Sequence, residues 1–113
     1  MLTIEGLKTF GADVEEGLKR CVNKEALYLK LVATVPGNDG FTKLPKAIEN
    51  HDLEAAFQAA HGLKGIILNL ALTPFASPVI EMTEHLRAKE DINYSSYLAE
   101  IEEKRAALEE LCK

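Results

Sequence analysis

The sequence predicts an all-α protein, and two observations support this class. Apolar residues recur at helical spacing along the whole chain, and no alternating run of β-branched residues is long enough to indicate a strand. Short connections join helices of similar length, which favours an up-and-down four-helix bundle. A chain of 113 residues fits one domain, 1–113, without an internal repeat.

The first two clear helical segments have candidate N-caps. Asp13 precedes "VEEGLKRC", and Glu16 follows it by three residues, as in a capping box. Asn23 is expected to cap the segment "KEALYLKLVATV", which "PGND" then ends.

A third segment, "FTKLPKAIENH", spaces Phe41, Leu44 and Ile48 at helical intervals. Pro45 interrupts it, and proline suits a first helical turn better than a helix interior. We therefore expect this helix to begin late or to bend at Pro45.

The longest regular segment follows, from Leu53 to about Leu72, with Asp52 as its N-cap. Thr73 before Pro74 and Ser77 before Pro78 are two competing starts for the next helix, because proline is favoured in a first turn. This helix is expected to end near Arg87 and to bury one face, formed by Phe75, Val79, Met82 and Leu86.

A polar break, "AKED", precedes the last helical segment, 93–113. Apolar residues repeat there every three to four positions, while the opposite face is almost wholly charged. This pattern predicts a helix with one solvated side. The buried side is expected to contain Tyr94, Leu98, Ile101, Leu108 and Cys112.

Composition excludes several classes of function. The formal net charge is −5, from 13 basic and 18 acidic residues, so a nucleic-acid partner is not expected. The first ten residues do not resemble a signal peptide, and no apolar stretch is long and uninterrupted enough to cross a membrane. Two isolated cysteines, Cys21 and Cys112, indicate reduced thiols, and we expect a cytoplasmic protein.

The segment 53–72 carries the candidate site. On a helical wheel of about 100° per residue, its apolar residues gather on one broad side, and His61 lies almost opposite. His61 is therefore expected to face solvent, where a neutral imidazole can act as a nucleophile. The side expected to be buried consists of Ala55, Ala56, Ala59, Ala60, Leu63, Ile66, Ile67 and Leu70.

The residues around His61 predict a place where another protein docks. Phe57, Leu68 and Leu72 share its face, and large apolar side chains on this face indicate either a docking surface or cover from a neighbouring helix. Lys64 follows His61 by three residues, within reach of an anion attached to the imidazole. Gly65 lies one turn after His61 and has no side chain that would block the approach to the imidazole. This explains a glycine here, although glycine costs a helix about 1 kcal/mol relative to alanine.

At "AAHGLKGIILNLA" the sequence resembles the phospho-accepting helix of histidine-containing phosphotransfer (HPt) domains of two-component phosphorelays. That motif is a histidine, any residue, Leu-Lys-Gly, small residues, and then Asn-Leu. The resemblance extends over essentially the whole chain. The residues that match the motif are His61, Leu63, Lys64, Gly65, Asn69 and Leu70.

The resemblance implies a four-helix bundle with additional short N-terminal helices and no independent catalytic activity. His61 is then the phosphorylated residue, and Lys64 holds the phosphoryl oxygens while Gly65 clears the way for the partner. The position of Gln58, one turn before His61, makes it a candidate hydrogen-bond partner of the phosphoryl group. Arg87 is a candidate to contribute positive charge from the adjacent helix, the alternative being a solvated helix end. The partner is the receiver domain of a response regulator or of a hybrid histidine kinase.

No cofactor is expected in this chain, since the resemblance places the Mg²⁺ in the receiver, and the sequence has no nucleotide-binding motif. Ile66, Ile67 and Ala71 replace small residues and a glycine of the HPt pattern. This departure leaves open a pseudo-HPt module that binds a partner without phosphotransfer. A metal-bearing bundle is disfavoured, because Glu81 and His85 lack the Glu-x-x-His spacing.

Overall fold

The computed structural model describes residues 1–113 and contains helices but no strand. The all-α prediction is therefore confirmed. No helix combines the length and the hydrophobicity that a bilayer crossing requires. In chain order the helices are α1 (Ile4–Phe10), α2 (Val14–Arg20), α3 (Glu25–Ala33), the short 3₁₀ helix η1 (Val35–Gly37), α4 (Gly40–Glu49), α5 (Leu53–Asn69), α6 (Thr73–Arg87) and α7 (Ser95–Leu111).

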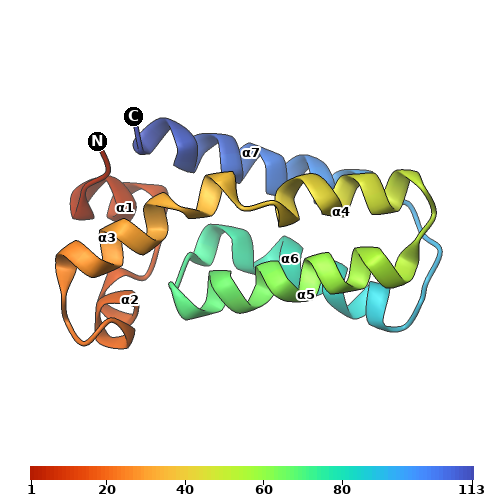
Figure 1. Ribbon diagram of the computed structural model, residues 1–113, viewed down its shortest axis with the longest axis horizontal. Coiled ribbons are helices and arrows are strands. Elements are labelled where there is room, and N and C mark those ends of the chain that lie inside the picture. The colour runs from red at the N-terminus through yellow and green to blue at the C-terminus, as the bar shows by residue number, and fades with distance from the viewer.

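Helices α4 to α7 lie side by side, and each runs opposite in direction to the one before it (Figure 1). Helix α5 packs between α4 and α6, and α7 contacts both α4 and α6. The short helices α1, α2 and α3 gather at one end of the molecule, where α1 meets α7 (Figure 1). This arrangement leaves α5 with one side toward α4, one side toward α6 and one side toward solvent.

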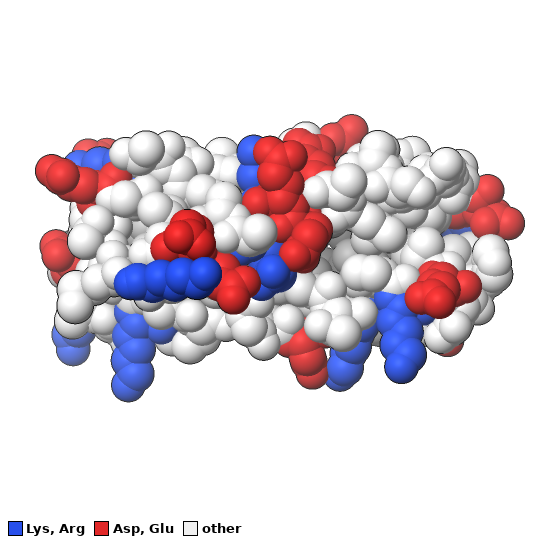
Figure 2. All heavy atoms as spheres, turned by 90° about the horizontal axis from the view of Figure 1, so that it is seen from above, with Lys and Arg blue, Asp and Glu red and all other residues white.

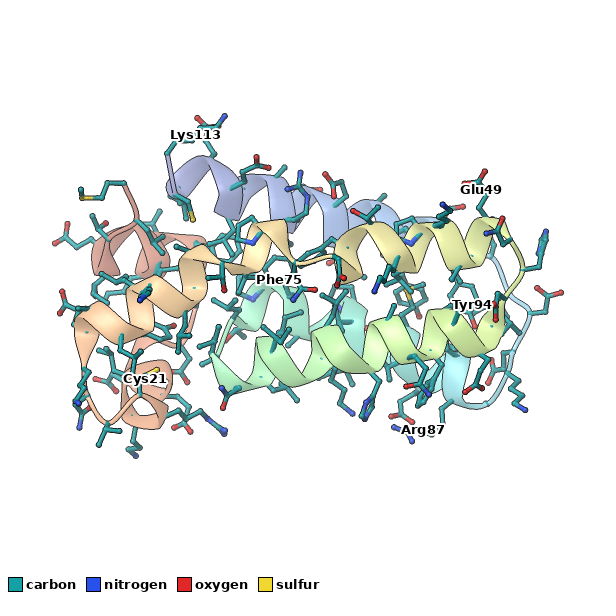
Figure 3. All side chains as sticks on the ribbon, in the orientation of Figure 1. Cys21, Glu49, Phe75, Arg87, Tyr94 and Lys113 are labelled. Carbon is teal, nitrogen blue, oxygen red and sulfur yellow. The ribbon has the colours of Figure 1, made fainter.

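One continuous hydrophobic core connects helices α4 to α7 with the end formed by α1, α2 and α3. Helix α6 contributes Phe75, Val79, Met82 and Leu86, all buried as predicted. Phe75 lies in the middle of the molecule (Figure 3) and contacts the rings of Phe10 and Phe41. In contrast, the face that carries α7 displays acidic and basic side chains interspersed (Figure 2), in keeping with its predicted solvated side.

Two of the three predicted N-caps are present. The Asp13 carboxylate accepts the Glu16 backbone N–H at 3.2 Å, and Asp52 accepts that of Ala55 at 3.0 Å. The prediction for Asn23 is wrong, because Lys24 is the N-cap of α3 and makes no side-chain cap bond. Asn23 instead adopts a left-handed conformation with φ 58° in the turn between α2 and α3, which asparagine tolerates better than most residues.

Helix α4 begins earlier than predicted, at Gly40, and contains Pro45 in its interior. The Asn38 side-chain oxygen accepts the Gly40 N–H at 2.8 Å and so supports the first turn. Pro45 has no N–H to donate to the Phe41 carbonyl, but the residues on both sides of it are helical. The helix therefore continues through the proline.

Helix α5 ends at Asn69, three residues before the predicted end. Ala71 has φ 56°, and the Leu72 N–H donates to the Ile67 carbonyl at 2.9 Å. This pattern is typical of a helix end with a left-handed residue after the C-cap. Leu72 is thereby turned into the core and precedes α6, which begins at Thr73, the first of the two expected starts.

Candidate functional site

His61 lies in the middle of α5, on the side of the helix that faces solvent. Its side chain is exposed, as predicted, whereas Ala60 and Leu63 on the opposite side are buried. The two neighbouring glycines, Gly62 and Gly65, leave open space around it: a Cβ atom added at either position would meet nothing within 4 Å. The imidazole is therefore accessible to a large visiting group.

Phe57, one turn before His61, contacts one side chain of its own helix and one of α6. Its ring centroid lies 5.6 Å from that of the His61 imidazole, with a tilt of 30° between the planes. The Arg87 guanidinium lies over the same Phe57 ring, 5.1 Å from its centroid. Arg87, at the end of α6, lies at the lower edge of the molecule, away from α7 (Figure 3). Phe57 is half-buried, so much of the ring serves packing rather than docking.

Lys64 lies on the α6 side of His61 and is half-buried. Its Nζ lies 3.9 Å from the Glu84 Oε1 of α6. The other oxygen of Glu84 lies 3.4 Å from the Arg87 Nε. Glu84 therefore lies between Lys64 and Arg87. Sequence analysis missed this residue: the three-residue spacing of Glu84 and Arg87 was visible, but the pairing of Glu84 with Lys64 depends on how α5 and α6 pack.

The other predicted site residues divide between surface and core. Leu68 is 42% exposed on the solvent side of α5, as expected of a docking residue. Leu72 is 0% exposed, so its prediction as a docking residue is wrong; the chain reversal at Ala71 takes it off the exposed face. Gln58 is exposed, and its side-chain amide donates to Glu54 at 3.3 Å.

A groove of about 600 Å³ lies between α4 and α5, on the other side of His61 from Glu84. Small residues of both helices line it, including Ala47, Ala55 and Gly62, and Lys43 and Lys46 stand on its α4 side. Ala55 is exposed, contrary to its predicted place on the buried side. The wheel included it because it is apolar, but Ala55 lines the open groove between α4 and α5.

No group of three or more His, Cys, Asp or Glu side chains is placed to hold a metal ion. Cys21 and Cys112 are free thiols. Both lie apart from His61: Cys21 in the end formed by the short helices, and Cys112 at the C-terminus. The chain matches no protein-family model, and no solved structure matches it.

Chemically, the site combines one nucleophile with two features of its surroundings. An exposed imidazole offers a nitrogen lone pair, Lys64 and Arg87 supply positive charge on one side, and the glycines leave the approach open. Such a surface can receive a small anionic group from another protein, because the cations stabilise the anion once it is attached.

Proposed function

We propose that this chain is a histidine phosphotransfer protein, in which α4 to α7 form an up-and-down four-helix bundle and His61 carries the phosphoryl group. The observation that carries this proposal is the placement of His61. Its ring is exposed at the middle of a helix, glycine leaves its surroundings open, and cations from two helices stand on one side. A core or surface-filling histidine requires none of these features.

The reaction transfers a phosphoryl group between this chain and an aspartate of a receiver domain. One imidazole nitrogen of His61 attacks the phosphorus of the aspartyl phosphate, the N–P bond forms, and the P–O bond breaks with its electron pair leaving on the carboxylate. The ring proton then passes to water. Phosphoryl transfer depends mainly on positioning and charge stabilisation, so the receiver brings the Mg²⁺ and this chain, which is not an independent enzyme, brings His61, Lys64 and Arg87.

The partner covers the solvent side of α5. Leu68 offers an apolar contact, and the groove between α4 and α5 offers small residues flanked by Lys43 and Lys46. Asp39 and Asp52 also line this groove, and Asp39 pairs with Lys43 at 3.0 Å, so the partner meets charges of both signs there. A partnership with receivers places the protein in the cytoplasm.

The test is to mix the protein with receivers whose aspartate is already phosphorylated with ³²P. We expect label to move to this chain as a phosphate that is labile in acid and stable in base, as a phosphohistidine is. Peptide mapping should place it on residues 53–72. Binding of a receiver without transfer of label would instead support the interaction module that lacks phosphotransfer.

A further inference from the structure

The charges beside His61 include one that opposes a phosphoryl group. Lys64 and Arg87 are cations, but the Glu84 carboxylate contacts both, one oxygen 3.9 Å from the Lys64 Nζ and the other 3.4 Å from the Arg87 Nε. Together these three side chains carry two positive charges and one negative charge, a net charge of +1. An acidic residue here is unexpected in a site that only has to hold an anion.

The geometry points to Glu84 as a positioning residue that competes with the phosphoryl group for Lys64 and Arg87. This inference rests on the proposed function. In the free protein, Glu84 holds the two cations beside His61 in a fixed and partly neutralised arrangement. After phosphorylation, Lys64 and Arg87 turn to the phosphoryl oxygens. The Glu84 carboxylate then lies close to these oxygens and no longer pairs with the two cations.

Exposure and reach agree with this exchange. The Glu84 side chain is 54% exposed and that of Lys64 is 26% exposed. Water can therefore solvate Glu84 when it loses its partners, while the Lys64 side chain stays against the surface of the protein. Lys64 follows His61 by three residues, which places the two side chains as neighbours on the helix surface. Arg87 is kept nearby by its contact with Phe57.

The consequence concerns the stability of the phosphohistidine. With Glu84 present, phosphorylated His61 is less stable than it would be beside Lys64 and Arg87 without a carboxylate. The carboxylate weakens their hold on the phosphoryl group by competition and repels the group directly. Both effects favour passing the phosphoryl group on. At a solvated site such charge effects are small, and we expect Glu84→Gln to lengthen the half-life of phosphorylated His61 by about threefold.

Phosphoramidate tests this without any receiver. The His61 nitrogen attacks its phosphorus, the N–P bond of the donor breaks, ammonia leaves and takes up the imidazole proton as ammonium. The half-life of the product is then followed by ³¹P NMR in the wild type, Glu84→Gln and Glu81→Gln. Glu81 is a matched control on the same helix, exposed and bound to Ser77 at 2.8 Å. Glu81→Gln should leave the half-life unchanged.

Further variants separate positioning from a merely structural role. The effect of Glu84→Gln should shrink in a Lys64→Ala background and at high salt, and Glu84→Asp should restore part of the wild-type half-life. Equal half-lives for the wild type and Glu84→Gln would overturn the inference, even if receivers label His61. A longer half-life in Glu84→Gln without labelling by any receiver would uphold the inference and remove the proposed function. No phosphorylation of His61 by phosphoramidate would overturn both.

Discussion

The rings of Phe57 and His61 lie with their centroids 5.6 Å apart and their planes tilted by 30°. Since Arg87 of α6 lies over the same Phe57 ring, one aromatic side chain links the proposed nucleophile to a cation from the neighbouring helix. Phe57 was predicted as a docking residue, and the structure adds this internal role.

Phe57→Leu tests that role. Leucine keeps the apolar contact but removes the aromatic face, which contributes about 0.5–1 kcal/mol to holding an exposed cation. We expect uptake of label by His61 to slow about threefold, while the free energy of unfolding falls by less than about 1.5 kcal/mol. Rates are measured with one phosphorylated receiver, and stability by urea unfolding. A matched Leu68→Ala variant should weaken receiver binding without changing uptake at saturating receiver. An unchanged uptake rate in Phe57→Leu would show that Arg87 needs no support from the ring.

His61→Gln should abolish labelling and leave the fold intact. The side chain is exposed, so the free energy of unfolding should change by no more than about 0.5 kcal/mol. His51→Asn is the matched control, because His51 is also exposed but has φ 56° at the end of α4, a conformation that asparagine accepts. The control should be labelled like the wild type. Label on the His61→Gln variant would disprove the assignment of the phosphorylated residue.

Gly65 separates docking from stability. A Cβ there meets nothing within 4 Å, so Gly65→Ala should raise the free energy of unfolding by about 0.5–1 kcal/mol through helix propensity. Gly65→Leu should also fold, but its side chain would occupy the approach to His61 and reduce receiver-dependent labelling at least tenfold. Labelling by phosphoramidate, which is small, should persist in Gly65→Leu. If receivers label this variant at the wild-type rate, the open space beside His61 has no part in docking.

Gly17 has the opposite environment. A Cβ at this position would overlap the Tyr28 ring, so Gly17→Ala must displace a buried side chain. We expect a loss of about 1–3 kcal/mol in the free energy of unfolding, as for other overpacked cores. Gly62→Ala is the control, since a Cβ there meets nothing within 4 Å. Equal stability of the two variants in urea would show that α2 moves away from Tyr28 without cost.

Tyr28 gives the protein a stability that depends on pH. Its hydroxyl donates to the Leu70 carbonyl at 2.9 Å, at the end of α5. Burial, with Cys21 and Asp13 adding to it, raises the pKa of Tyr28 from 10.0 to about 12. Above pH 10 the unfolded chain therefore loses this proton before the folded protein does, and the free energy of unfolding falls as the pH rises toward 12.

Tyr28→Phe removes this dependence. At pH 8 the variant should be less stable by about 1–3 kcal/mol, because a buried carbonyl loses its donor. The difference between the wild type and the variant should narrow as the pH rises from 10 toward 12. Tyr97→Phe, at a half-buried position, serves as the control in the same urea titrations. Parallel pH profiles for the wild type and Tyr28→Phe would contradict the assigned pKa.

The sequence alone determined the helical class, the caps at Asp13 and Asp52, the buried face of α6 and the exposure of His61. Each of these depends on local spacing or on one helix wheel, and a wheel places a residue correctly when the side it faces is set by a long apolar stripe. The wheel also placed Lys64 and Gly65 beside His61, since helix neighbours three and four residues apart are fixed by backbone geometry.

Only the tertiary structure decided the rest. Leu72 is buried because the left-handed conformation of Ala71 reverses the chain. Ala55 is exposed because a groove lies between α4 and α5. Glu84 contacts Lys64 because α5 and α6 pack together. These outcomes depend on how separate helices lie against one another. Spacing within one helix reports which side of it is apolar, but contacts between helices join residues far apart in the chain, and no local pattern specifies them.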